Sequence, residues 1–457
     1  MPDKKIRTRI APSPTGLLHV GTARAALFNE LYAKHNNGQF VIRIEDTDQE
    51  RSEEKFEEDI LTGLKWLELE WDEGPNKKGD NGPYRQSERT EKYQKALEKL
   101  IKEDKAYQEP GEEVIKFRVT ETTVTFSDLI RGEVTINADS WGGDFIIARS
   151  IKDPLFHLAV VVDDAEMHIS HVIRGEDHLS NTARHILLQK ALGFDQPEYA
   201  HLPLLLDKDR KKLSKRAGDV SLLSYKDKGI LPEAIINYLA LLGWNPGDER
   251  ELFTHKELIA EFNLKNVQKG GAIFDQEKLE SINKQYLSKL GPDELLAWGK
   301  EYFEQDPKKY KPFLKMDAQL LLAALQTEQS RISSYYELHV LLDWARPDWT
   351  GEYENNALVW RNSTAEATIE YLKALHEVLS NINEDEFNEK FLANKLLSWI
   401  KEKEWKNGDV LWPMRVALTD REQSPGPFEV ATAIGPETTL ARIHQATKIL
   451  SDSISEG

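Results

Sequence analysis

The first hundred residues alternate between strand-like and helix-like patterns of apolar positions. An apolar stretch over 6–11 predicts a strand, a turn with prolines and glycine interrupts it, and good helix formers predict a helix over 23–34. We expect Thr22 to cap this helix, Gly38 to end it, and 39–44 to form a second strand. Strand, crossover helix and strand predict a parallel βαβ unit.

A long amphipathic helix is predicted from about residue 50, with one apolar face formed by Phe56, Ile60, Leu64 and Leu67. From 106 to 150 the apolar period changes to two. This change predicts short antiparallel strands over 114–119, 134–136 and 145–147. We interpret the segment as a small insertion inside the α/β fold.

After this insertion the parallel pattern resumes. The near-continuous apolar run 156–162 predicts a buried strand, 179–192 a helix and 201–206 another strand. Further along, the chain is predicted to be almost entirely helical, beginning with a helix that Pro232 starts and Gly243 stops. The predicted fold class is therefore an α/β Rossmann-type domain with a parallel sheet and an inserted small α+β domain, followed by an all-α C-terminal half.

Composition narrows the function classes. The 457 residues carry a net charge of −18, which disfavours indiscriminate binding to nucleic acid but permits a specific RNA partner at a local basic patch. Cysteine is absent, which excludes disulfides, a thiol nucleophile and Cys-ligated zinc. No apolar run reaches eighteen residues and the start has no apolar signal segment, so we predict a cytoplasmic protein without a membrane partner.

The first chemical candidate is the segment 9–22, which ends the first strand and opens the first helix. A glycine-bearing turn at a helix N-terminus is a natural phosphate site, because amide groups and the positive helix end face the anion. We expect Gly21 to let a nucleotide approach closely and His19 to donate to a phosphate oxygen. Alternatively, His19 is a turn residue bonded to its neighbours. No GxGxxG is present, so a dinucleotide is not supported.

The second candidate is the basic segment 207–218, which follows an apolar strand. Lysines beside a phosphate site can neutralise the charge that builds on a leaving pyrophosphate. A solvated charge run is the alternative, although two lysines flanking Leu213 and Ser214 form a more particular pattern.

Together, 19–22 and 212–216 resemble the His-x-Gly-x and Lys-Met-Ser-Lys-Ser signatures of class I aminoacyl-tRNA synthetases. Further segments resemble bacterial-type glutamyl-tRNA synthetases and follow in order over nearly the whole chain: 9–16, 43–48, 157–159, 162–164, 172–178 and 231–244. Several motifs in register make coincidence a poor explanation.

The resemblance implies a glutamate–tRNA ligase that uses ATP with Mg²⁺ to form glutamyl-adenylate. The enzyme would then transfer glutamate to the 3′ end of tRNA(Glu) and release AMP and pyrophosphate. The implied catalytic residues are His19, Lys212 and Lys215. The implied ATP-binding residues are Pro12, His19, Gly21, Thr22, Lys212, Ser214, Lys215 and Arg216.

Glutamate has two carboxylates and one ammonium group, so its site needs two cations, best supplied by arginines, and an acid. Arg9 and Arg174 would be the cations and Glu45 the acid. Alternatively, each arginine forms a structural ion pair with Glu45, Asp46 or Glu176. By resemblance, Arg9 holds the side-chain carboxylate and Arg174 completes carboxylate recognition. The implied glutamate-binding residues are Arg9, Ser13, Glu45, Phe156, Arg174 and His178. Phe156 and Val160 stand where the family commonly has tyrosine and asparagine.

The resemblance also divides the chain. The implied parts are a first Rossmann half (1–105), a shortened acceptor-end-binding insertion (106–155), a second Rossmann half (156–207), the Lys-Met-Ser-Lys-Ser-like loop with a stem-contact helical domain (208–290) and an α-helical anticodon-binding region (291–457). Arg331 aligns with an arginine used near the third anticodon base, and a surface salt bridge is the alternative. We expect a monomer.

Histidines 157, 168, 171, 178 and 185 invite a metal hypothesis. His168 and His171 lie three apart in a predicted strand and would face opposite sides, so we expect no structural zinc and no other metal site.

Competing functions make different demands on the sequence. A non-discriminating enzyme would also charge tRNA(Gln), and a catalytically dead tRNA-binding paralogue would not need the two signatures. A paralogue that glutamylates a modified tRNA base would lack the helical C-terminal half. A small-molecule adenylyltransferase would have no use for that half. A glutamine-specific ligase would carry β-barrel anticodon domains.

Overall fold

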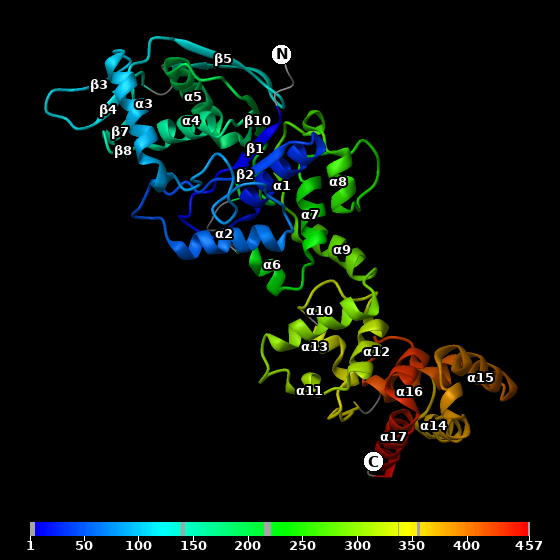
Figure 1. The fold of residues 1–457 in the computed structure, drawn as a ribbon. Coiled ribbons are helices and arrows are strands. Elements are labelled where there is room, and N and C mark those ends of the chain that lie inside the picture. The colour runs from blue at the N-terminus through cyan, green and yellow to red at the C-terminus, as the bar shows by residue number, and fades with distance from the viewer. Residues whose placement is uncertain (1–4, 139–141, 214–220, 337, 354–356, 456–457) are drawn as a thin grey trace. The chain divides into compact units, whose positions relative to one another are not determined.

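The computed structural model describes residues 5–138, 142–213, 221–336, 338–353 and 357–455 (Figure 1). The chain divides into two compact units, Met1–Ile282 and Asn283–Gly457, and each is described by itself. Helix α9 (Gln276–Leu287) contains the division between them.

The first unit is mixed α/β. Its strands are β1 (Arg7–Ile10), β2 (Gln39–Ile42), β3 (Ala106–Gln108), β4 (Ile115–Phe117), β5 (Thr123–Asp128), β6 (Gly132–Asn137), β7 (Phe145–Ser150), β8 (Asp153–Pro154), β9 (His171–Gly175), β10 (Glu198–Leu202), β11 (Leu205–Leu206) and β12 (Ala272–Ile273). Its helices, besides α9, are α1 (Val20–His35), α2 (Glu54–Trp66), α3 (Thr90–Lys102), α4 (Phe156–Glu166), α5 (Leu179–Leu192), α6 (Leu223–Asp227), α7 (Pro232–Leu241) and α8 (His255–Glu261).

The predicted βαβ unit is confirmed. Strands β1 and β2 pair in parallel, with α1 as the crossover. The predicted cap is wrong, because the N-cap is His19 and not Thr22. The backbone at His19 is extended, and its Nδ1 accepts from the amides of Gly21 and Thr22, so the imidazole does what a cap hydroxyl usually does.

A second parallel pair lies beside the first. Strands β9 and β10 pair in parallel with α5 between them in sequence, and Ser170 N donates to Arg7 O at 2.9 Å next to β1. The hairpin β5–β6 joins the same layer through β10, giving the strand order β6-β5-β10-β9. Strands β3, β4, β7 and β8 form a separate antiparallel sheet. The predicted antiparallel strands therefore exist, but one hairpin of them extends the parallel layer.

The predicted strand over 156–162 is wrong, because these residues open helix α4. Every residue from Leu158 to Asp164 is buried, so the helix has no polar face to reveal its period. A short apolar run looks the same in a fully buried strand and a fully buried helix.

Two smaller predictions also fail. The strand expected over 201–206 is split into β10 and β11 by Pro203, which has no amide hydrogen to continue a ladder. His168 is not in a strand with His171; it lies in the turn after α4 with a positive φ of 54°.

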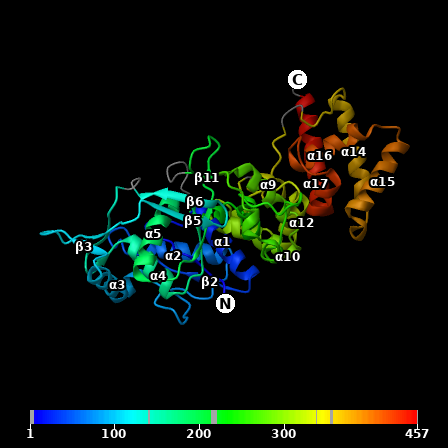
Figure 2. The same ribbon diagram turned by 90° about the horizontal axis from the view of Figure 1, so that it is seen from above.

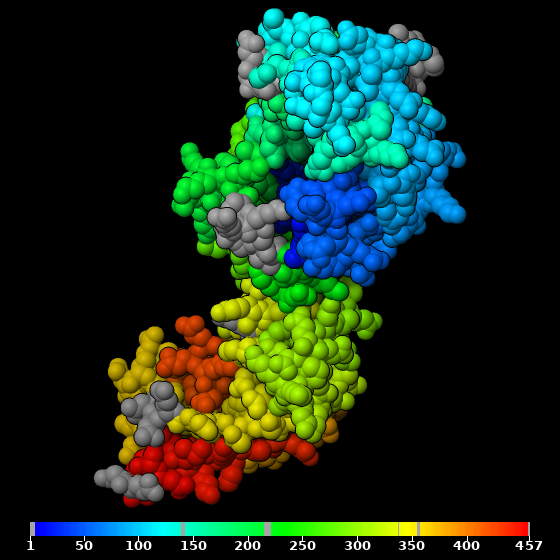
Figure 3. All heavy atoms as spheres, turned by 90° about the vertical axis from the view of Figure 1, so that its left-hand side faces the viewer, coloured from blue at the N-terminus to red at the C-terminus, as the bar shows by residue number. Residues whose placement is uncertain are grey.

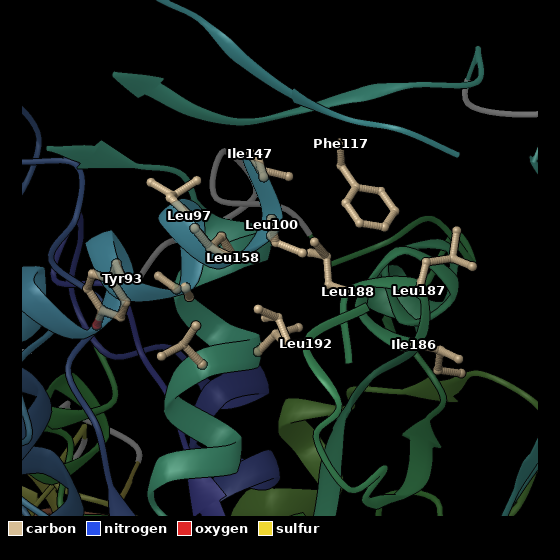
Figure 4. Packing of buried hydrophobic residues seen from close by; sticks show 14 of the residues in the cluster. Tyr93, Leu97, Leu100, Phe117, Ile147, Leu158, Ile186, Leu187, Leu188 and Leu192 are labelled. Atoms are coloured by element: carbon tan, nitrogen blue, oxygen red, sulfur yellow. The ribbon is translucent and has the colours of Figure 1, made fainter. Parts of the chain in front are cut away.

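One hydrophobic core connects the antiparallel segment to the helices beside it. Figure 4 shows Leu97 and Leu100 of α3, Leu158 of α4, Phe117 of β4 and Ile147 of β7 in this cluster. Residues 106–150 therefore share a core with the parallel layer. The confirmed helix α7 precedes Gly243, whose φ of 94° suits the position after a helix end.

The second unit is helical. Its helices are α10 (Pro292–Glu304), α11 (Lys311–Leu314), α12 (Ala318–Glu328), α13 (Leu338–Leu341), α14 (Ala365–Ser380), α15 (Glu389–Glu402), α16 (Asn407–Thr419) and α17 (Pro427–Ser455). Helices α14 and α16 pack against α17 (Figure 2). In the described ranges, we find no helix with both the length and the apolar character needed to span a membrane.

Candidate active site

A cavity of about 370 Å³ opens where β1 meets the first turn of α1. Figure 3 looks onto this face, where the dark blue N-terminal residues lie at the bottom of a hollow between blue and green segments. Its wall contains every predicted ATP- or glutamate-binding residue that the structure describes: Arg9, Pro12, Ser13, His19, Gly21, Thr22, Glu45, Phe156, Arg174, His178 and Lys212. Ser214, Lys215 and Arg216 lie outside the described residues.

His19 has the contacts of a turn residue and also faces the cavity. Its Nδ1 accepts from Gly21 N at 3.1 Å and Thr22 N at 3.3 Å, so Nε2 carries the ring proton. Nε2 lies 3.1 Å from Thr22 Oγ1. A Cβ on residue 21 would lie 3.0 Å from the imidazole, so Gly21 leaves room for the ring of His19. The two amides expected to face a phosphate are thus bonded to His19.

Arg9 forms an ion pair with Asp164 at the base of the cavity. Its Nε and Nη2 lie 3.1 and 3.3 Å from the two carboxylate oxygens, and both residues are buried. Burial alone would raise the pKa of Asp164, but the Arg9 and Arg43 guanidiniums hold it below its ordinary value. Arg9 therefore forms a structural ion pair, but its partner is Asp164 and not one of the three carboxylates expected.

Arg43, fully buried, connects three carboxylates behind the cavity wall. Its Nη1 donates to Asp164 at 2.7 Å, its Nη2 to Glu45 at 3.0 Å, and its Nε lies 3.7 Å from Asp163. Burial alone would lower the pKa of Arg43, but these carboxylates raise it above its ordinary value. A permanently charged fork matches this arrangement better than a lysine would.

Asp163 connects this network to three further side chains behind it. It accepts from Arg89 Nε at 2.6 Å, Gln86 Nε2 at 2.8 Å and Tyr93 Oη at 2.9 Å. Arg43, Asp163 and Asp164 lie in the motif segments 43–48 and 162–164, and no role was predicted for them. Charged residues inside apolar stretches were the available signal, because a buried charge requires a partner.

Glu45 lines the cavity while its Oε1 accepts from Arg43. Burial raises the pKa of Glu45, although Arg43 opposes the shift. Its backbone amide donates to Pro12 O at 3.0 Å, which ties the end of β2 to the turn after β1.

Arg174 is a second buried arginine at this cavity, and its surroundings are different. Its Nη2 donates to Thr182 Oγ1 at 2.7 Å and to the carbonyl of His178 at 3.4 Å, and its Nε to Nε2 of His201 at 3.4 Å. Among the residues that the structure describes, no carboxylate forms an ion pair with it. Burial lowers the pKa of Arg174 to about 10.

Phe156 sits among three histidines. Its ring centroid lies 5.3 Å from that of His157, 5.9 Å from His178 and 5.7 Å from His185. Burial, with Arg174 nearby, lowers the pKa of His178 to about 4, so the ring is neutral near pH 7. His168 and His171 are not part of this group. In the described part of the chain no three His, Asp or Glu side chains are placed to hold a metal ion, and the absence of zinc stays a prediction.

Lys212 lies at the mouth of the cavity. Its Nζ donates to Asp177 Oδ2 at 2.9 Å, and both side chains are exposed. Burial alone would raise the pKa of Asp177, but the Lys212 ammonium helps to hold it below its ordinary value. Lys212 is therefore held at the mouth by an exposed ion pair that a phosphate could replace.

Arg331 lies in the second unit. Its Nη1 donates to Glu328 Oε2 at 2.9 Å, and the other oxygen of this buried carboxylate accepts from Trp344 Nε1 at 3.0 Å. Burial raises the pKa of Glu328, although Trp344 and Arg331 oppose the shift. The salt bridge considered for Arg331 is present, and its partner is buried.

Two family models match this chain. The model for the catalytic domain of class I tRNA synthetases (E and Q) matches 5–113 and 108–281, and an anticodon binding domain model matches 302–447. The glutamate–tRNA ligase of Heliobacterium modesticaldum is 38% identical over 98% of this chain and 97% of its own length. The glutamate–tRNA ligase of Moorella thermoacetica is 37% identical over 99% of this chain and 100% of its own.

Solved structures agree with these relatives. A glutamate tRNA ligase from Elizabethkingia meningosepticum, crystallised in complex with its amino acid, superimposes with a TM-score of 0.86. It is 30% identical and covers 98% of this chain and 100% of that one. The predicted family is thus confirmed over nearly the full length, and the chain belongs to the glutamate–tRNA ligase family of class I aminoacyl-tRNA synthetases.

Proposed function

We infer that this protein is a glutamate–tRNA ligase in which Arg174 receives a carboxylate of the substrate. The amino-acid carboxylate attacks the α-phosphate of ATP, giving glutamyl-adenylate and pyrophosphate. A ribose hydroxyl at the 3′ end of tRNA(Glu) then attacks the acyl carbon and displaces AMP. No covalent enzyme intermediate is needed, so positioning and charge stabilisation carry the catalysis.

The observation that carries the proposal is the buried Arg174 guanidinium on the cavity wall. Its described hydrogen-bond partners are a hydroxyl, a carbonyl and neutral histidines. A buried cation without a carboxylate at contact distance is a strong receptor for an anion, because the pair forms in a low dielectric. Arg9 contributes a second positive charge, which its ion pair with Asp164 partly compensates. Glu45 would face the ammonium group, and Ser13, Phe156 and His178 complete the glutamate pocket.

The ATP side is proposed to lie at the first turn of α1. His19 Nε2 and the Thr22 hydroxyl are the donors there, with Pro12 and Gly21 shaping the wall. Lys212, Lys215 and Arg216 would neutralise the charge on the departing pyrophosphate, and Ser214 would bind ATP through its hydroxyl. We assign His19, Lys212 and Lys215 as catalytic residues on this basis. Class I synthetases use ATP, and Mg²⁺ would be bound together with it.

The parallel strands with α1 and α5 support a Rossmann-type catalytic domain into which residues 106–155 are inserted. We propose that this insertion holds the acceptor end and that 208–290 contacts the stem. Arg331 would read the third anticodon base from the helical region. Its ion pair with Glu328 leaves other guanidinium hydrogens for a base, since a guanidinium has five donors.

The test uses purified protein, ATP, Mg²⁺ and labelled glutamate with a transcript of tRNA(Glu) or tRNA(Gln). Lys215→Ala should lose at least about a hundredfold in kcat, as is usual when a charge-stabilising donor is removed. Lys208→Ala is its matched control, since Lys208 pairs with Glu277 on the exposed side of the same segment. Arg174→Met should raise the KM for glutamate about a hundredfold, since a buried charged hydrogen bond is lost.

Each arm has a distinct meaning. Label on tRNA(Glu) that Lys215→Ala abolishes and Lys208→Ala keeps supports the ligase and its main catalytic residue. Equal label on tRNA(Gln) identifies the non-discriminating alternative. No label on either transcript from folded protein would favour the catalytically dead paralogue. An unchanged glutamate KM in Arg174→Met would remove the role assigned to that residue.

A further inference from the structure

Arg174 stands at one end of a row of polar side chains on three neighbouring strands. The sheet order places β5 beside β10 and β10 beside β9. Arg174 of β9 is the register partner of His201 of β10, and Tyr199 of β10 is the register partner of Asp128, the last residue of β5. This register brings Asp128, His201 and Arg174 together although they come from separate parts of the chain.

The hydrogen bonds along this row run in one direction. His201 Nδ1 lies 2.6 Å from Asp128 Oδ2, and a carboxylate can only accept, so Nδ1 carries the proton. Nε2 is then the acceptor for Thr182 Oγ1 at 2.9 Å and Arg174 Nε at 3.4 Å. Thr182 Oγ1 in turn accepts from Arg174 Nη2 at 2.7 Å. Burial lowers the pKa of His201, although Asp128 opposes the shift. The ring is therefore neutral, and the tautomer with its proton on Nδ1 links Asp128 to Thr182 and Arg174.

Every member of the row is buried, so water does not compete for these bonds. The cation and the carboxylate stand at opposite ends with neutral groups between them. The chain engages Nε and Nη2 of Arg174, while Nη1 has a long 3.5 Å contact to Nδ1 of His185. The protein therefore fixes the edge of the guanidinium that carries Nε and Nη2. Because the group is planar, this contact also sets the direction of the remaining N–H donors.

We propose that Asp128, in the β5–β6 hairpin, is a positioning residue for glutamate binding that orients Arg174 through His201 and Thr182. The proposal rests on the carboxylate-binding role given to Arg174 above. It assigns a part in amino-acid recognition to the insertion that otherwise would serve the tRNA acceptor end.

Asp128→Asn tests this with little change in shape. An asparagine can keep the oxygen that accepts from Ile130 N at 2.9 Å and Arg131 N at 2.8 Å, so the hairpin turn is retained. Its amide nitrogen then faces His201 and forces the other tautomer, which turns Nε2 into a donor against Arg174. We expect the KM for glutamate to rise about tenfold or more, as for other residues that orient a binding group, with kcat and the KM for ATP nearly unchanged.

Two further variants separate positioning from general damage. Asp144→Asn changes an exposed carboxylate of the same insertion that accepts from Tyr107 Oη and Val119 N, and it should leave the glutamate KM as in wild type. Thr182→Val removes the hydroxyl that links His201 to Arg174 and keeps the direct 3.4 Å contact between Arg174 Nε and His201 Nε2. Combined with Asp128→Asn it should raise the glutamate KM by less than the product of the two single effects, because both changes act on the connection between His201 and Arg174.

Aminoacylation of tRNA(Glu) at varied glutamate, run beside Arg174→Met, decides the matter. A selective rise in glutamate KM in Asp128→Asn with non-additivity at Thr182 supports the proposal. A wild-type KM in Asp128→Asn while Arg174→Met is impaired overturns it and leaves the role of Arg174 intact. Equal rises for glutamate and ATP overturn it in favour of a structural role. An unaffected Arg174→Met overturns both assignments.

Discussion

The two arginines of the cavity stand in opposite electrostatic surroundings. Arg9 meets Asp164 directly, and behind it Arg43 joins Asp164, Glu45 and Asp163. Arg174 is equally buried but faces a hydroxyl, a carbonyl and neutral imidazoles. One wall of the cavity is thus charge-balanced before any substrate arrives, while the other has a cation whose counter-charge is distant.

This difference separates two tasks that a binding site must perform. A balanced network gives rigidity, because each buried charge is held by partners that would be costly to lose. An unbalanced cation gives affinity for an anion, and its burial is a cost that the ligand relieves. The Arg9 wall therefore shapes the pocket, and the Arg174 wall is where a carboxylate would contribute most to binding.

The largest expected effect is on the network behind the Arg9 wall. Asp163→Asn leaves Arg89 without its buried carboxylate and removes one of the three carboxylates around Arg43, and we expect a loss of about 3–5 kcal/mol in the free energy of unfolding. Asp104→Asn, which removes an exposed pair with Arg118, should change it by less than about 0.5 kcal/mol. Urea unfolding of both variants measures the contrast, and equal losses would contradict it.

A direct comparison of the walls comes next. Arg9→Met should destabilise by about 2–3 kcal/mol, because Asp164 loses one of its two guanidiniums. Arg174→Met should lie within about 1 kcal/mol of wild type, since removing a buried cation without a carboxylate partner relieves desolvation. Paired unfolding curves test this. A larger loss in Arg174→Met than in Arg9→Met would break the distinction between the walls.

The Arg174 wall should also be the acid-sensitive one. The pKa of His178 is about 4 in the folded protein and 6.5 ordinarily, so between these values the unfolded chain binds the proton more readily. Stability is therefore lost as pH falls from about 6.5 toward 4, by about 1 kcal/mol at pH 5.5 for this group. His178→Asn should lose correspondingly less on acidification while His157 and His185 remain. Parallel slopes in variant and wild type would refute the assignment.

The smallest effect belongs to the mouth of the cavity. The exposed pair of Lys212 with Asp177 should contribute less than about 1 kcal/mol to stability. Lys212→Ala should therefore melt like wild type yet charge tRNA more slowly. A clear drop in melting temperature would mean that Lys212 serves the fold and not the mouth.

Much of the site could be predicted from short segments. The strand–turn–helix of 7–35 could be predicted because the apolar period changes at a turn that contains proline and glycine. The predicted site residues that the structure describes line one cavity. The predictions that were wrong concern segments whose apolar positions show no helix or strand period. Helix α4 is buried along consecutive residues, so its sequence could not distinguish it from a strand, and the cap at His19 depended on a ring conformation.

The sequence by itself determined the family, the βαβ core and the side chains available for charge recognition, because these depend on motifs and periods within short segments. Only the tertiary structure decided which charges compensate one another. Arg9 and Arg43 meet Asp164 across 155 and 121 residues, and Asp128 reaches His201 across 73. Packing chooses such partners through strand order and helix placement. Arginine is therefore a charge-balanced support at one wall and a buried cation without a carboxylate partner at the other.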